Sequence, residues 1–193
     1  PLLAQSLTSS PLELSLATTA RTLPLALFTI FCGLIADRYD RLSIMKTSNI
    51  VRGIVFVLLA GASLLGIMNI ACLVIAAFLI GCLEVLHDNT MESFPPSIVQ
   101  KDQLVQANGY IASAEHIANN CVGSPLASLI LSASQTLGIF SNGITYLFSA
   151  LVYKFMRHQV KFHSAPRSSV SAVAIMKEIR EGFRFVAKQP LLR

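Results

Sequence analysis

The feature that most constrains the fold is a series of long apolar runs separated by short polar segments. The runs cover residues 12–36, 47–66, 70–86, 104–131 and 138–155. A helix rises about 1.5 Å per residue, so runs of roughly 17–25 residues cross a hydrocarbon core about 30 Å thick. Only 13% of the residues are charged, against about 25% in soluble domains. The sequence therefore predicts an all-α, polytopic helical membrane protein.

Proline marks several expected helix boundaries and bends. Ser10-Pro11-Leu12-Glu13 has the spacing of a helix start, with Ser10 as the cap and Pro11 in the first turn. Pro24, near the middle of the first complete run, is expected to kink that helix. The segment Phe94-Pro95-Pro96 should end the run that begins at Ile70.

Basic residues predict the orientation in the membrane. Of the 15 Lys and Arg, all except Arg21 and Arg52 lie in residues 33–46, at Lys101, or from Lys154 onward. By the positive-inside rule these segments are cytoplasmic. The net charge of +5 then marks topology, and we expect the lipid bilayer rather than nucleic acid as the partner.

The chain is expected to have two parts. Residues 1–156 form a transmembrane bundle, in which residues 1–7 are the remnant of a helix whose start is missing. Residues 157–193 form a cytoplasmic linker, where apolar residues recur at helical spacing on one face. This helix is either a simple linker or a regulatory surface helix. Because the chain starts at Pro1 without a signal-peptide pattern, we expect a fragment or a truncated product.

The charged segment at residues 33–46 resembles the signature loop of the major facilitator superfamily. That loop has a glycine, three variable positions, Asp-Arg, a variable residue, a second glycine and two basic residues. Gly33, Asp37, Arg38 and Arg41 match it, whereas Asp40 and Leu42 depart from it. The segment is similar to the loops of the macrolide, multidrug and siderophore exporter branch, which includes enterobactin-exporter-like proteins.

Two other stretches resemble the same branch, at residues 95–109 and 181–193. The resemblance implies helices two to six of a twelve-helix transporter in the bacterial inner membrane. It also implies proton-coupled efflux of drugs or siderophore-like compounds by alternating access, with a missing C-terminal half as partner. No cofactor is expected beyond the proton gradient. Residues 123–128 further resemble the helix-5 motif of drug/proton antiporters, with Gly123 and Pro125 matching it.

A conformational latch is expected around the charged segment. Asp37 ends a helix, where a carboxylate is unfavourable unless an arginine offsets it. Glu84 and Asp88 lie four residues apart and so share one helix face. We hypothesise that Arg41 reaches one of them, and that this ion-pair cluster latches the transporter in its outward-facing state. The alternative is that these charges only fix the topology.

Charges inside the spans are costly and are functional candidates by default. Asn108, Glu115 and Asn119 fall at i, i+7 and i+11, which places them on one stripe of a helix. Glu115 is the candidate proton-coupling or cation-binding group, with Arg21 as its possible partner. A structural hydrogen bond between helices is the alternative.

The remaining polar residues of the spans suggest structural roles. Arg52 is expected to snorkel or pair locally. His87 and His116 have no second ligand at metal spacing, and we assign them structural roles; no metal site is expected. No catalytic constellation stands out, so the protein is not expected to be an enzyme. The alternative to a transporter is a truncated membrane protein that does not transport and acts, if at all, as a scaffold.

Overall fold

The structure is a computed structural model, and it describes residues 10–159. Every regular element in this part of the chain is a helix. Residues 1–9 and 160–193 include the predicted helix remnant and nearly all of the predicted linker, and they lie outside the described residues.

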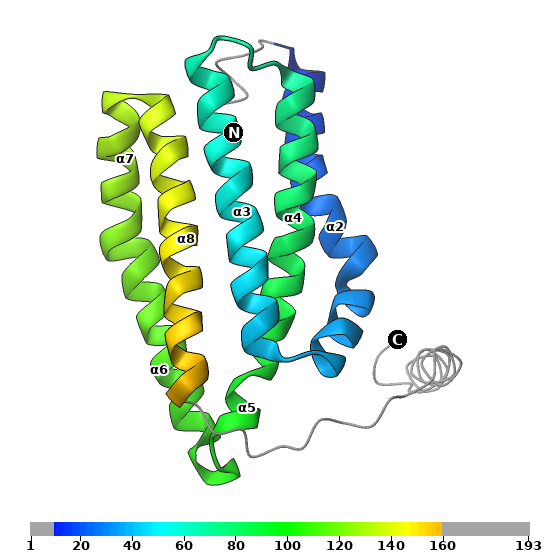
Figure 1. Ribbon diagram of the computed structural model, residues 1–193, viewed down its shortest axis with the longest axis vertical. Helices are drawn as coiled ribbons and strands as arrows, with labels where there is room; N and C mark the ends of the chain where they lie inside the picture. The colour runs from blue at the N-terminus through cyan, green and yellow to red at the C-terminus, as the bar shows by residue number, and fades with distance from the viewer. Residues whose placement is uncertain (1–9, 160–193) are drawn as a thin grey trace.

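Four helices of the described part are long and apolar enough to cross a membrane. They are α2 (Pro11–Arg38), α3 (Arg41–Leu64), α4 (Ile70–Ser93) and α8 (Gln135–Gln159). Short connections let α2, α3 and α4 run up and down in turn, and α8 lies beside α3 (Figure 1). These helices match four of the five predicted runs, which confirms the polytopic helical membrane fold. As predicted, α4 ends just before Phe94.

The fifth predicted run is a continuous helical stretch with a change of helix type inside it. It comprises α6 (Leu104–His116), the π-helical segment η2 (Ile117–Gly123) and α7 (Ser124–Ala133). Between α4 and α6 lie the short helix α5 (Pro95–Ile98) and the 3-10 turn η1 (Lys101–Gln103).

The π segment has an identifiable cause. Pro125 has no N–H, and its ring would clash with a carbonyl one α-turn earlier. The backbone N–H of Ser124 instead bonds to the carbonyl of Asn119, five residues back, and the Ser124 hydroxyl donates to the same oxygen at 2.9 Å. This wider turn shifts the residues after η2 around the helix axis. The face that carries Asn108, Glu115 and Asn119 therefore does not run on regularly into α7.

The predicted hinge at residues 33–46 is shorter in the structure. Helix α2 continues to Arg38 and α3 already begins at Arg41, so only Tyr39 and Asp40 are non-helical. The Asp40 carboxylate accepts a hydrogen bond from the Ser43 amide at 3.1 Å and caps α3. This cap starts the helix earlier than the apolar pattern alone predicted.

Close backbone approaches hold the bundle together at glycines. On α3 and α8, Gly53 and Gly143 face each other: a Cβ on Gly53 would lie 3.1 Å from the Gly143 carbonyl oxygen. On α4, a Cβ on Gly81 would collide with the carbonyl oxygen of Arg21 on α2. Small residues at helix crossings are the usual means of close packing in membranes.

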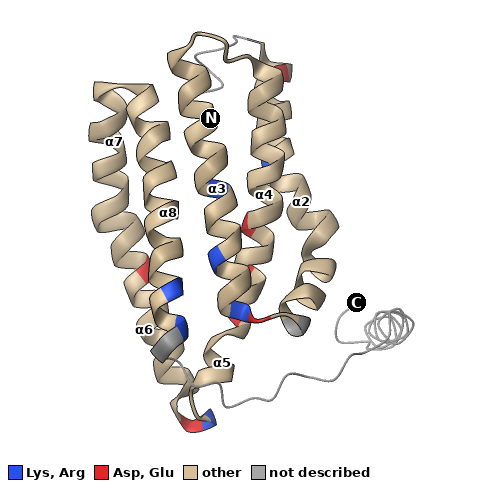
Figure 2. Cartoon of the chain, viewed as in Figure 1, with Lys and Arg blue, Asp and Glu red and all other residues tan. Residues whose placement is uncertain are grey.

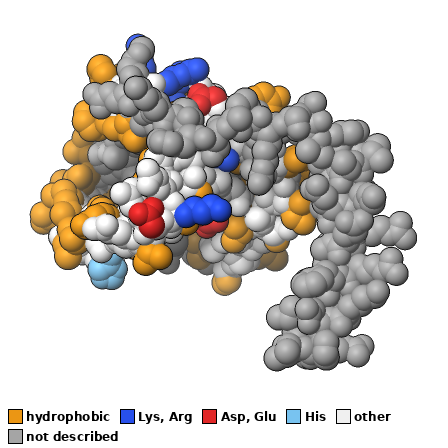
Figure 3. Space-filling view, turned by 90° about the horizontal axis from the view of Figure 1, so that it is seen from below, with side chains coloured by type: hydrophobic (Ala, Val, Ile, Leu, Met, Phe, Trp, Pro, Cys, Tyr) orange, Lys and Arg blue, Asp and Glu red, His pale blue; other side chains and the backbone are white. Residues whose placement is uncertain are grey.

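Apolar side chains cover much of the outer surface, as expected for a bundle that faces lipid. Leu58, Leu64, Phe148 and Phe155, for example, are all more than half exposed. Lys and Arg residues lie in the middle and lower parts of the described helices (Figure 2). Acidic and basic groups also show on the surface seen from below (Figure 3).

Candidate functional site: a polar junction of α2, α3, α4 and α8

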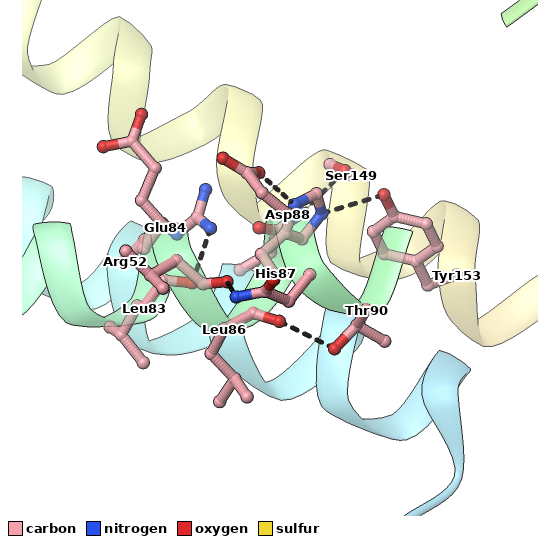
Figure 4. Close-up of polar contacts among 12 residues, drawn as sticks. Arg52, Leu83, Glu84, Leu86, His87, Asp88, Thr90, Ser149 and Tyr153 are labelled. Atoms are coloured by element: carbon pink, nitrogen blue, oxygen red, sulfur yellow. Dashed lines mark hydrogen bonds and ion pairs between the residues drawn. The ribbon is translucent and has the colours of Figure 1, made fainter. Parts of the chain in front are cut away.

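The candidate site is a group of polar side chains around the lower half of α4, which we call the polar junction. Residues from α3, α4 and α8 meet there (Figure 4), and α2 contributes an ion pair. Its members are Arg21, Asn49, Arg52, Glu84, His87, Asp88, Ser149 and Tyr153.

Arg21 and Glu84 form an ion pair between α2 and α4. The guanidinium Nε and Nη2 donate to the two carboxylate oxygens at 3.2 and 2.9 Å. This bidentate geometry is the strongest that an arginine and a carboxylate adopt. The prediction that Arg21 pairs with Glu115 is wrong, because α2 packs against α4 and places Glu84 within reach.

The Arg21–Glu84 pair is open on one side. The Arg21 side chain is 58% exposed and that of Glu84 is 33% exposed. An exposed ion pair within a hydrocarbon core is costly, so intramembrane charges normally face a bundle interior or a water-filled cavity.

Arg41 does not reach either of the carboxylates predicted for it. Its Nε donates to the Ser93 hydroxyl at the end of α4, at 3.1 Å. Glu84 binds Arg21 instead. Asp88 contacts His87. The prediction failed because α3 begins at Arg41, which places this side chain against the last turn of α4 rather than one or two turns further in.

Other residues of the charged segment at residues 33–46 contact α8. Asp40 and Arg157, at the end of α8, are 3.7 Å apart, and Arg157 also donates to the Ser43 hydroxyl at 2.9 Å. Asp40, which departs from the family pattern, thus caps α3 and contacts α8. Gly33 lies within α2, where a Cβ would meet nothing within 4 Å. Asp37 and Arg38 end α2, and their side chains lie outside the described set.

Arg52, which was expected to snorkel or pair locally, is a buried cation. It is 4% exposed, so it does not snorkel, and its contacts are with neighbouring helices. It donates to the Leu83 carbonyl of α4 at 2.7 Å, and its guanidinium carbon lies 5.2 Å from the centre of the Tyr146 ring on α8. It has no ion-pair partner among the described residues, and a cation–π contact partly replaces one. An arginine within an apolar run was the available signal for this role.

His87 also proves to be a bridging residue rather than an isolated one. Its Nδ1 lies 3.1 Å from Asp88 and its Nε2 lies 3.1 Å from the Tyr153 hydroxyl on α8. By contrast, His116 bonds only to Asn120 of the same helical stretch. No local pattern distinguished the two histidines, because the partner of His87 lies 66 residues away.

The polar residues of α6 and η2 lie apart from the junction. Asn108, Glu115 and Asn119 are all exposed, and the Glu115 side chain has no ion-pair partner within residues 10–159. Gly123 has a structural reason for its lack of a side chain, since a Cβ would lie 2.9 Å from the Ala118 carbonyl oxygen. Pro125 begins α7. Within the described residues, no group of three His, Cys, Asp or Glu is arranged to hold a metal ion.

The fold and the length of its apolar helices define a multi-pass helical membrane protein. The model of the transmembrane secretion effector family matches residues 2–193. The chain therefore belongs to this family of the major facilitator superfamily, and its described helices are part of the N-terminal half of that fold.

Two curated relatives from Bacillus subtilis strain 168 are similar to the chain. YfiS, named "Uncharacterized MFS-type transporter", is 27% identical over 99% of this chain and 44% of its own length. BacE, named "Putative bacilysin exporter", is 28% identical over 85% of this chain and 39% of its own length. The chain thus spans less than half of the length of these relatives. No solved structure matches it at the significance that these relatives reach.

Proposed function

We propose that the full-length protein exports small molecules from the cell by alternating access, driven by the proton gradient. The proposal rests first on family membership over residues 2–193. In transporters of this kind, two halves rock about a substrate site near the middle of the membrane. This chain would supply one wall of that site, and the missing C-terminal half would supply the other.

The observation that carries the proposal is the Arg21–Glu84 pair. It joins two membrane-spanning helices well inside their lengths, and it is open on one side. An ion pair with a purely structural role would be expected to be buried between helices, because charge exposed to lipid is unfavourable. An open, bidentate pair next to a buried arginine instead suits a water-filled transport pathway.

The substrate class and the orientation extend the same proposal. The signature segment resembles exporters of macrolides, other drugs and siderophores, and one relative is named as a bacilysin exporter, so amphiphilic drugs and siderophore-like compounds are the proposed substrates. We further propose that the α2–α3 connection and the segment after residue 159 lie on the cytoplasmic side of the bacterial inner membrane, which the positive-inside rule supports.

We still propose a latch at the cytoplasmic ends of the helices, but with contacts other than those expected from the sequence. Arg41 with Ser93 fastens α3 to the end of α4, and Asp40 with Arg157 fastens it to the end of α8. Both contacts lie where Asp37 and Arg38 end α2. We propose that this cluster closes the cytoplasmic end in one state of the cycle. Glu115, with Asn108 and Asn119, remains a candidate for contacting the proton or the substrate.

The test is efflux by the full-length protein in proteoliposomes against a panel of amphiphilic drugs and siderophores. Export of at least one compound that stops with a protonophore is expected. Glu84→Gln should reduce it to background, whereas Glu13→Gln, the same change in the first turn of α2, should leave it intact. Correctly inserted protein that exports none of the compounds would favour the alternative, a membrane protein that does not transport.

A further inference from the structure

His87 is the centre of a hydrogen-bonded chain that joins α4 to α8. The chain starts at the Asp88 carboxylate, which is 65% exposed, and passes through His87, which is 16% exposed. It ends at the Tyr153 hydroxyl on α8. Ser149, also on α8, accepts a hydrogen bond from the buried amide of Asn49 on α3 at 2.9 Å. The chain therefore connects an exposed carboxylate with the interior of the bundle (Figure 4).

The charged groups near His87 in the polar junction come from α2, α3 and α4 itself. Arg52 of α3 donates to the carbonyl of Leu83 on α4, and Arg21 of α2 binds Glu84. Asp88 is the carboxylate in contact with the ring. The two arginines and two carboxylates balance when the histidine is neutral. One proton added to the ring leaves the junction with one positive charge in excess.

We propose that His87, held by Asp88, is a proton-binding site of the transport cycle, and that Tyr153 passes the effect of the proton to α8. The inference rests on the proposed proton-coupled transport. In the neutral ring, Nδ1–H donates to Asp88 and Nε2 accepts the Tyr153 O–H. A proton from water binds Nε2, and Asp88 stabilises the imidazolium. The Tyr153 hydroxyl then accepts from Nε2–H, and its own hydrogen turns away from the ring.

Rotation of the Tyr153 hydroxyl changes the contact between α4 and α8. Protonation converts a neutral hydrogen bond across the two helices into a charge-assisted one, which is about twice as strong. Histidine is the side chain whose charge changes within about pH 5–8. A gain or loss of one proton at His87 can therefore tighten or loosen α8 against α4.

The first test observes the proton directly and does not require transport. The full-length protein, labelled with 15N at histidine, is placed in lipid nanodiscs and titrated between about pH 8 and 5. The His87 signal, assigned with His87→Gln, should convert from the neutral to the imidazolium form, and Asp88→Asn should alter that conversion. His116→Gln is the matched control and should leave the His87 signal unchanged. A His87 ring that stays neutral throughout would overturn the proposal, even if the protein transports.

The second test links the site to transport. In proteoliposomes, His87→Gln should flatten the pH dependence of efflux at a fixed substrate gradient, and His116→Gln should not. Tyr153→Phe removes one hydroxyl and should weaken the pH dependence while the 15N titration persists. A wild-type pH profile in both His87→Gln and Tyr153→Phe would refute the role in coupling. Absence of any efflux in the wild type would refute the proposed function, while the titration would still decide the site.

Discussion

The four packed helices α2, α3, α4 and α8, which we call the packed half, differ from the α6–η2–α7 stretch in the contacts of their polar residues. In α2, α3, α4 and α8, charged side chains meet partners on other helices: Arg21 binds Glu84 and Arg52 binds a carbonyl of α4. In α6 and η2, Glu115 is exposed and has no such ion pair in the described part of the chain. Backbone contact between helices is what differs, because glycines bring the four packed helices close enough for side chains to meet.

The largest expected effect comes from the closest helix contact. Gly81→Ala places a methyl group against the Arg21 carbonyl and should destabilise the protein by about 2 kcal/mol, the usual cost of overpacking. The same change at Gly109 of α6, where a Cβ meets nothing within 4 Å, should be neutral or stabilising by about 0.5 kcal/mol. Denaturation in detergent measures both. Equal effects at the two sites would contradict the close backbone approach of α4 and α2 at Gly81.

A smaller effect is expected at the cap between α2 and α3. Asp40→Ala removes the hydrogen bond to the Ser43 amide and the contact with Arg157. Loss of an N-cap costs about 1 kcal/mol, and an exposed ion pair adds less than that. Asp40→Asn keeps the cap and should recover most of the stability. If Asp40→Asn is as unstable as Asp40→Ala, the Arg157 contact matters more than the cap.

The smallest effect is expected in the exposed stretch. Pro125→Ala restores an N–H and removes the ring that favours the wide turn, so η2 should gain α-helical hydrogen bonds. Because this region has few contacts with the rest of the bundle, stability should change by about 0.5 kcal/mol or less. Hydrogen exchange at residues 117–124 would show the change. A destabilisation as large as that of Gly81→Ala would contradict the difference between the two regions.

The sequence predicted the spans well, because apolar length alone determines where a helix can cross a membrane. It predicted the partners of the charges poorly. Arg21 was matched with Glu115 and Arg41 with Glu84 or Asp88, since each residue was placed on its own helix but the packing between helices was unknown. The contact of Gly81 with Arg21 and the early cap at Asp40 decide that packing. His87 was assigned a structural role, and its bond to Tyr153 was not foreseen because that residue lies on another helix, 66 residues away in the sequence.

The most direct test of the pairing inside the packed half is a charge exchange measured by efflux. Arg21→Glu and Glu84→Arg should each abolish export by the full-length protein in proteoliposomes, because each leaves two like charges together between α2 and α4. The double exchange restores a pair of opposite charges and should recover a measurable part of the export. A double variant as inactive as the single ones, or single variants that still export normally, would contradict a functional Arg21–Glu84 pair.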